Sequence, residues 1–225
     1  EAEGRIWSFF FFFQKMAMKL PKYKKSLSFL NDITTELILE RKTSGVYPDD
    51  LLTRAIQSCD GSAASRKILQ DKVMSYLTSA HETTANAMAW VWFELAQRPE
   101  ILRQVVAEVD RVLDGRDPTY EDVKNLKYTW AVFEETLRLY PPVWTMSREA
   151  QTEDHIPLDD GRKLRVKKGD TIMLSPYVVH RRASYWPDPL AFDPDRFMEE
   201  QEPDRQKLSY FPFGGGARLC LGFRF

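Results

Sequence analysis

The sequence predicts a mainly α-helical protein with a small β-sheet. Up to about residue 140, apolar residues recur at three- and four-residue steps, which is the spacing of amphipathic helices. After the proline pair Pro141-Pro142 the pattern changes to short alternating runs, which are typical of strands. Over residues 176–213 regular periodicity is lost and prolines interrupt the chain repeatedly. The predicted order is therefore helices, then a small sheet, then a structured coil.

The first three helices are predicted from apolar spacing. One covers residues 21–41, and a shorter one contains Leu51, Leu52 and Ile56. The longest candidate runs from about residue 65 to residue 97 without a proline. Its second half, residues 85–96, is apolar on nearly every side, so we expect that half to be buried.

Two further helices precede the sheet. Pro99 begins one, and Asp114-Gly115 ends it. Thr119 opens a capping-box pattern that starts a short turn of helix, and residues 128–140 form the last helix before the proline pair. We expect the β region at about 149–175 and the meander with the cysteine loop at about 182–222.

Composition excludes several classes of protein. The 225 residues are 43% hydrophobic and include 14 Phe, 6 Trp and 9 Tyr, which is too much apolar area for a disordered chain. A net charge of −1 argues against a nucleic-acid partner held by a general basic field. Two cysteines give no disulfide framework, so each is read singly.

The two ends of the sequence suggest an excerpt of a longer protein. There is no initiator Met, and the chain stops without a polar tail. The apolar run over residues 6–13 is far shorter than a membrane span needs, and its acidic start does not fit a signal peptide. We leave open whether the Phe9–Phe13 run faces a membrane, an access channel or a core, and whether the protein is cytoplasmic or anchored upstream to a cytoplasmic membrane face.

The stretch from Phe211 to Gly222 is the most informative part of the sequence. Three consecutive glycines, beginning at Gly214, let the backbone turn tightly and approach a flat partner. Cys220 follows, just before a possible helix N-terminus, where amide groups and the helix dipole favour a thiolate that can bind a metal. The plainer interpretations are a small buried cysteine and an ordinary glycine loop.

The spacing of five residues in this stretch resembles the haem-binding loop of the cytochrome P450 family, Phe-x-x-Gly-x-Arg-x-Cys-x-Gly. The matching residues are Phe213, Gly216, Arg218, Cys220 and Gly222. The resemblance implies that Cys220 is the axial thiolate ligand of the haem iron, that Phe213 packs near the sulfur, and that Arg218 pairs with a propionate. It extends over essentially the whole chain after the Phe-rich start, so residues 1–225 are expected to be a partial P450 domain.

A second site lies in the middle of the longest predicted helix. Glu82 and two threonines interrupt an otherwise apolar run, which on the plainest interpretation is one solvated face. A zinc-protease motif is excluded, because the second His would have to stand at Ala85. The segment resembles the oxygen-binding stretch of P450 proteins, with Ala80 in place of the usual glycine. The resemblance implies that Thr83 hydrogen-bonds bound dioxygen and that Glu82 helps to relay protons.

A third site contains Glu135 and Arg138, three residues apart on one helix face. Ion pairs with this spacing are common and weak on helix surfaces, so the pair alone does not indicate a function. With the following prolines it resembles the Glu-x-x-Arg motif of P450 proteins, and Arg196 stands in a segment that resembles Pro-Glu-Arg-Phe. The resemblance implies a buried Glu135–Arg138–Arg196 triad of architectural role. Arg148 matches the basic residue that faces the other propionate. His180 resembles a family His near the meander, and we assign it no catalytic role.

The resemblance implies an oxidoreductase, a haem-dependent monooxygenase that inserts one oxygen atom from O2 into a lipophilic organic substrate. The implied cofactor is haem b, iron protoporphyrin IX. The implied partners are a small lipophilic substrate, O2 and an electron-donor protein, either a reductase, a ferredoxin or a fused reductase domain. Two alternatives stay open: a truncated non-catalytic remnant or interaction fragment, and a haem-thiolate isomerase or dehydratase. Val143, Trp144 and Met146 suit an apolar ligand, and core packing explains them almost as well.

Overall fold

The computed structural model describes residues 20–158, 160–198, 206 and 208–223. The Phe9–Phe13 run lies outside these residues. The chain divides into two compact units between His81 and Glu82. Within the described part, no helix combines the length and the apolar character that crossing a membrane requires.

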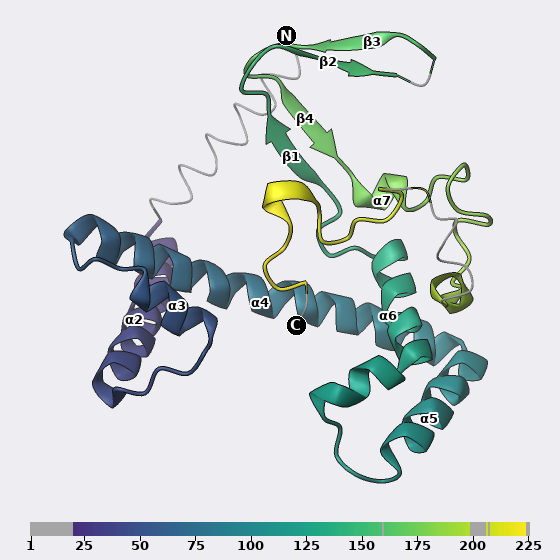
Figure 1. The fold of residues 1–225 in the computed structure, drawn as a ribbon, viewed down its shortest axis with the longest axis horizontal. Helices are drawn as coiled ribbons and strands as arrows, with labels where there is room; N and C mark the ends of the chain where they lie inside the picture. Colours follow the sequence, from purple (N-terminus) through teal and green to yellow (C-terminus); the bar gives the residue numbers. More distant parts are fainter. Residues whose placement is uncertain (1–19, 159, 199–205, 207, 224–225) are drawn as a thin grey trace. The chain divides into compact units, whose positions relative to one another are not determined.

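The first unit is helical (Figure 1). It holds α2 (Pro21–Ser44), α3 (Leu51–Gln57) and the beginning of α4 (Ala63–Gln97). Pro21 starts α2 and Gly45, with φ +65°, ends it, which are positions where the two residue types are favoured. Asp50 caps α3 by accepting from the Thr53 amide. The core of this unit joins α3 to α4 through Ala55, Ile56, Leu69 and Val73.

The second unit contains the rest of α4, α5 (Pro99–Leu113), the 3-10 helix η1 (Tyr120–Asn125) and α6 (Lys127–Leu139). The expected capping box at Thr119 is present at the start of η1. Helix α6 has no cap of its own, and Glu108 of α5 accepts from the amides of Tyr128 and Thr129 instead. The core here is Val91, Leu95, Ile101, Val132, Leu139 and Phe192.

The expectation that residues 85–96 are buried all round is wrong for the described structure. Ala87, Val91 and Leu95 are buried on one face, where the core of the second unit lies. Trp92 and Phe93 are 61% and 50% exposed. An apolar composition makes a helix suited to burial on every side, but the packing of other elements decides which sides are buried. In the described residues, other elements pack against one side of this part of α4.

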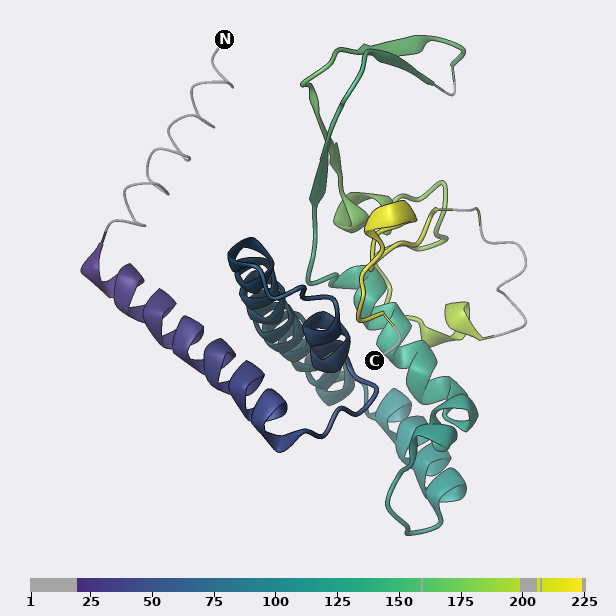
Figure 2. The same ribbon diagram turned by 60° about the vertical axis from the view of Figure 1, so that its left-hand side comes forward.

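The β region forms two separate antiparallel ladders rather than one sheet. β1 (Met146–Glu149) pairs with β4 (Thr171–Leu174), and β2 (Asp154–Pro157) pairs with β3 (Lys163–Val166). In Figures 1 and 2 the β2–β3 hairpin projects from the far end of the β1–β4 ladder. The Ala150 amide donates to the Asp170 carbonyl and the Gly169 amide donates to the Ala150 carbonyl, at the Glu149–Thr171 end of the β1–β4 ladder.

A long irregular segment follows the strands. It contains the short helix α7 (Pro176–Val179) and the 3-10 turns η2 (Pro194–Phe197) and η4 (Gly216–Arg218). Trp186 and Phe197 pack with Ala131 of α6 in a second small core. The irregular chain is therefore packed against α6, the helix that carries the Glu-x-x-Arg sequence.

Candidate active site

The cysteine loop, which we define as residues 211–223, presents Cys220 on its surface. Cys220 is exposed and forms no disulfide, and its amide donates to the Phe213 carbonyl at 3.0 Å. Gly214 has φ +76°, and a Cβ there would lie 3.4 Å from Met146 Sδ at the start of β1. Glycine suits this position because of its left-handed backbone, whereas a Cβ would make only an ordinary contact with the Met146 side chain.

The helix N-terminus expected after Cys220 is not formed within the described chain. The 3-10 turn η4 precedes the cysteine, and Leu221, Gly222 and Phe223 form a turn after it. Only three described residues follow Cys220, fewer than the four-residue step of an α-helical hydrogen bond.

Three successive residues attach the start of the loop to the rest of the unit. The Ser209 carbonyl accepts from Trp186 Nε1 at 3.3 Å, and the Tyr210 hydroxyl donates to the Glu134 carbonyl at 3.1 Å. The Phe211 amide donates to His180 Nε2 at 2.9 Å. The start of the loop is therefore held by two side chains of the preceding irregular segment, Trp186 and His180, and by one main-chain carbonyl of α6.

Glu135 and Arg138 form a fully buried ion pair. Arg138 Nε donates to Glu135 Oε2 at 2.6 Å, and Nη2 donates to Oε1 at 2.8 Å. The remaining guanidinium hydrogens donate to three main-chain carbonyls, those of His180, Pro189 and Ala191, at 2.7 to 2.9 Å. The guanidinium has five N–H groups, so every one of them has an acceptor.

Arg196 approaches the same carboxylate from the meander. Its Nε lies 3.7 Å from Glu135 Oε1, and its Nη2 donates to the Asp188 carbonyl at 2.9 Å. Burial raises the pKa of Glu135, against the opposing effect of Arg138. The structure thus brings Glu135, Arg138 and Arg196 together, with Arg196 as the more distant member.

The other predicted residues lie on separate elements. Glu82 and Thr83 are on α4, the first exposed and the second half-buried. Arg148 is half-buried on β1, where its Nη1 donates to the Ser147 carbonyl. Arg218 is exposed in η4. Phe213 is half-buried, Gly216 is exposed, and Gly222 lies beside the Cys220 sulfur.

One buried network was missed by the sequence analysis. Glu94 of α4 is 2% exposed, pairs with Arg98 and accepts from the Tyr140 hydroxyl at 2.6 Å. The Tyr140 ring stacks on Trp90 at 4.0 Å between centroids. Burial and the Glu94 carboxylate raise the pKa of Tyr140 to about 12, so its hydroxyl keeps its proton. The available signal was a single carboxylate within the apolar half of α4, because such a group must have partners.

The contacts of His180 were also not predicted from the sequence. It is fully buried and touches both α6 and the cysteine loop. Burial lowers its pKa to about 4, so the imidazole is neutral near pH 7. A His-Arg dipeptide in a coil gave no indication of these contacts.

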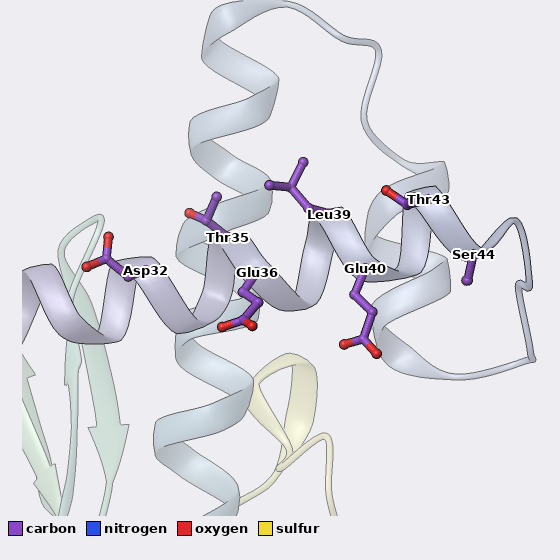
Figure 3. Close-up of a pocket in the computed structure, with 7 residues that line it drawn as sticks. All are labelled: Asp32, Thr35, Glu36, Leu39, Glu40, Thr43 and Ser44. Carbon is purple, nitrogen blue, oxygen red and sulfur yellow. The ribbon is translucent and has the colours of Figure 1, made fainter.

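A surface hollow occurs elsewhere, on α2 in the first unit (Figure 3). Its lining residues are Asp32, Thr35, Glu36, Leu39, Glu40, Thr43 and Ser44. All seven belong to one exposed helix, and none of the predicted site residues is among them. The hollow is therefore no candidate for the chemistry that the motifs imply.

Comparison with known proteins identifies the family. The model of the cytochrome P450 family matches residues 3–225. Cyclooctatin synthase and cyclooctat-9-en-7-ol 5-monooxygenase, both of Streptomyces melanosporofaciens, are 38% and 35% identical; each match covers 91% of this chain and 45% of the relative. The crystal structure of the cytochrome P450DA heme domain is similar with a TM-score of 0.78 and 30% identity, over 90% of this chain and 45% of that chain. The chain spans less than half the length of these relatives, and it belongs to the cytochrome P450 family.

Proposed function

We propose that the protein is a haem-dependent monooxygenase that inserts one oxygen atom from O2 into a lipophilic organic substrate. The proposed axial ligand is the Cys220 thiolate, and the proposed cofactor is haem b. Family membership implies a haem, and one relative is named as a monooxygenase. The observation that carries the proposal is an exposed, unpaired Cys220 at the end of a glycine-rich loop whose start is attached to the buried Glu135–Arg138 pair through His180.

The residues of the cysteine loop fit a haem. Cys220 is exposed, and a Cβ added at Gly215 or Gly216 would meet no atom within 4 Å, so the loop has open space at these two glycines. The described residues contain no group of three or more His, Cys, Asp or Glu side chains arranged to hold a metal ion. Arg218 and Arg148 supply the positive charge that two propionates need.

When bound, the haem supplies the activation of dioxygen that no side chain supplies. In the proposed mechanism the protein moves protons. Thr83 Oγ1, half-buried on α4, is proposed to donate a hydrogen bond at the dioxygen site, and the exposed Glu82 carboxylate is proposed to help relay protons to that site. Glu135 and Arg138 are not expected to touch the reacting atoms.

The substrate is proposed to be apolar. Val143 and Trp144, between α6 and β1, are 42% and 60% exposed, and large exposed apolar side chains in adjacent positions suit a lipophilic ligand. Electrons are proposed to come from a reductase, a ferredoxin or a fused reductase domain.

The test is the absorbance spectrum of the reduced, CO-bound protein. Thiolate ligation predicts a red-shifted Soret band in the wild type and its loss in Cys220→Ser. The matched control is Cys59→Ser, which removes the other cysteine of the sequence and should leave the band unchanged. A normal band in Cys220→Ser would overturn the ligand assignment.

Two further measurements separate the alternatives. A non-catalytic remnant would show no saturable, Cys220-dependent binding when hemin is titrated into the chain. A haem-thiolate isomerase or dehydratase does not need the Thr83 hydroxyl, so unchanged turnover in Thr83→Ala would favour that class over a monooxygenase.

A further inference from the structure

The structure contains a hydrogen-bonded path from the buried ion pair to the cysteine. His180 lies 42 residues after Arg138 and 31 residues before Phe211, and it contacts both. Its Nδ1 is 3.2 Å from the Arg138 carbonyl, and its Nε2 accepts from the Phe211 amide at 2.9 Å. Its own carbonyl accepts from Arg138 Nη1 at 2.7 Å.

The two partners determine the state of the imidazole. An amide N–H can only donate, so Nε2 must be unprotonated, and a carbonyl can only accept, so Nδ1 must carry the proton. The ring is fully buried, and the Arg138 and Arg181 cations nearby add to the cost of charging it. A buried neutral histidine with both nitrogens bonded holds its two partners in one relative position.

The path continues through the loop itself. The Phe211 carbonyl accepts from the Gly214 amide at 3.0 Å, and the Phe213 carbonyl accepts from the Cys220 amide at 3.0 Å. From Pro212 to Cys220, the backbone-to-backbone hydrogen bonds of the described chain join loop residues to one another. The Phe211 amide is therefore the group through which the cysteine loop is hydrogen-bonded to His180.

We propose that His180 is a positioning residue for Cys220, which it holds in place through the Phe211 amide while its other nitrogen is attached to α6. This inference rests on the proposed function, because Cys220 is the proposed iron ligand. His180 itself touches neither the sulfur nor, in the proposal, the cofactor. Its contribution is to couple the end of α6 to the start of the cysteine loop.

Three substitutions test separately the hydrogen bonds of His180 to the Arg138 carbonyl and to the Phe211 amide. His180→Phe keeps an aromatic ring and removes both bonds. His180→Asn places an amide nitrogen near the position of Nδ1 and retains the bond to α6, but it does not reach Phe211. His180→Gln places its terminal group near the position of Nε2 and restores an acceptor for the Phe211 amide. The matched control is His155→Asn, on the exposed strand β2.

Two readouts are compared in the haem-loaded protein. Amide hydrogen exchange at Phe211, Gly214 and Cys220 should be roughly tenfold faster in His180→Asn than in the wild type or in His155→Asn, the size expected for one lost buried hydrogen bond. The fraction of protein with the red-shifted reduced-CO band should fall in His180→Asn, and His180→Gln should recover both readouts. Unchanged exchange at Cys220 together with an unchanged band in His180→Asn would overturn the proposal.

The two proposals fail separately. If Cys220→Ser retained a normal band, the ligand assignment would be wrong, but hydrogen exchange would still report whether His180 holds the loop. If His180→Phe does not fold, His180→Asn, which keeps the bond to α6, carries the test by itself.

Discussion

Replacing Arg138 by lysine tests whether the shape of its side chain, and not only its charge, holds the second unit together. Arg138 donates five hydrogen bonds: the two to Glu135 and the one to the His180 carbonyl are buried, and those to the Pro189 and Ala191 carbonyls are part-buried. A lysine ammonium has three N–H donors, so at least two acceptors lose their partner. At about 1–3 kcal/mol for each buried unsatisfied group, Arg138→Lys should lower the free energy of unfolding by about 2–6 kcal/mol. That is a large share of the roughly 5–15 kcal/mol that stabilises a typical protein.

The assay is urea unfolding followed by circular dichroism, with Arg165→Lys as the matched control. Arg165 also makes two hydrogen bonds to one carboxylate, that of Glu153, at 2.9 and 2.8 Å. The Arg165 and Glu153 side chains are 59% and 50% exposed and lie in the same unit as Arg138, so Arg165→Lys should change the free energy of unfolding by less than about 0.5 kcal/mol. An equal decrease in the free energy of unfolding of Arg138→Lys and Arg165→Lys would refute the argument that the Arg138 guanidinium is required.

Three further predictions concern other buried polar groups. The pKa of His180 in the folded protein, about 4, lies below its ordinary value of 6.5, so the unfolded chain binds the proton more readily. As pH falls from about 6.5 to 4, the free energy of unfolding of the wild type should therefore fall by about 3 kcal/mol relative to that of His180→Asn. Urea unfolding at each pH measures this difference. Tyr140→Phe keeps the stacked ring but takes the hydroxyl from buried Glu94, so it should cost about 1–3 kcal/mol, whereas Tyr120→Phe, at a 79% exposed position, should cost nothing measurable in the same assay. Glu108→Gln turns an amide group towards the amides that begin α6 and should cost about 1–2 kcal/mol; an unchanged denaturation midpoint would show that α6 needs no cap from α5.

The helices were predictable because local signals determine them. Pro21 and Pro99 begin α2 and α5, and the Thr119 pattern gives the capping box that the structure contains. Strands β1 and β2 were not predicted individually. All four residues of β2 are exposed, so burial on one face imposes no alternation on its sequence.

Long-range polar contacts could not be predicted. The Tyr140 hydroxyl reaches Glu94 across 46 residues, and His180 joins Arg138 to Phe211 across 42 and 31 residues. Residues so far apart in the sequence follow no local spacing pattern that would predict their contact. The Glu135–Arg138 pair differs because a helix sets its i, i+3 geometry locally, although its burial was inferred only from a family resemblance.

The irregular segment after α7 explains why these contacts are polar. A helix or sheet satisfies its own carbonyls, but a coil that packs against a core must find donors elsewhere. One guanidinium supplies donors to His180, Pro189 and Ala191, and one imidazole supplies the acceptor for Phe211. Apolar residues of the same volume at these two positions would leave the coil carbonyls and the Phe211 amide unpaired. Buried charge at Arg138 is therefore the consequence of packing irregular chain against α6, because the carbonyls of that chain need donors that regular structure would otherwise supply.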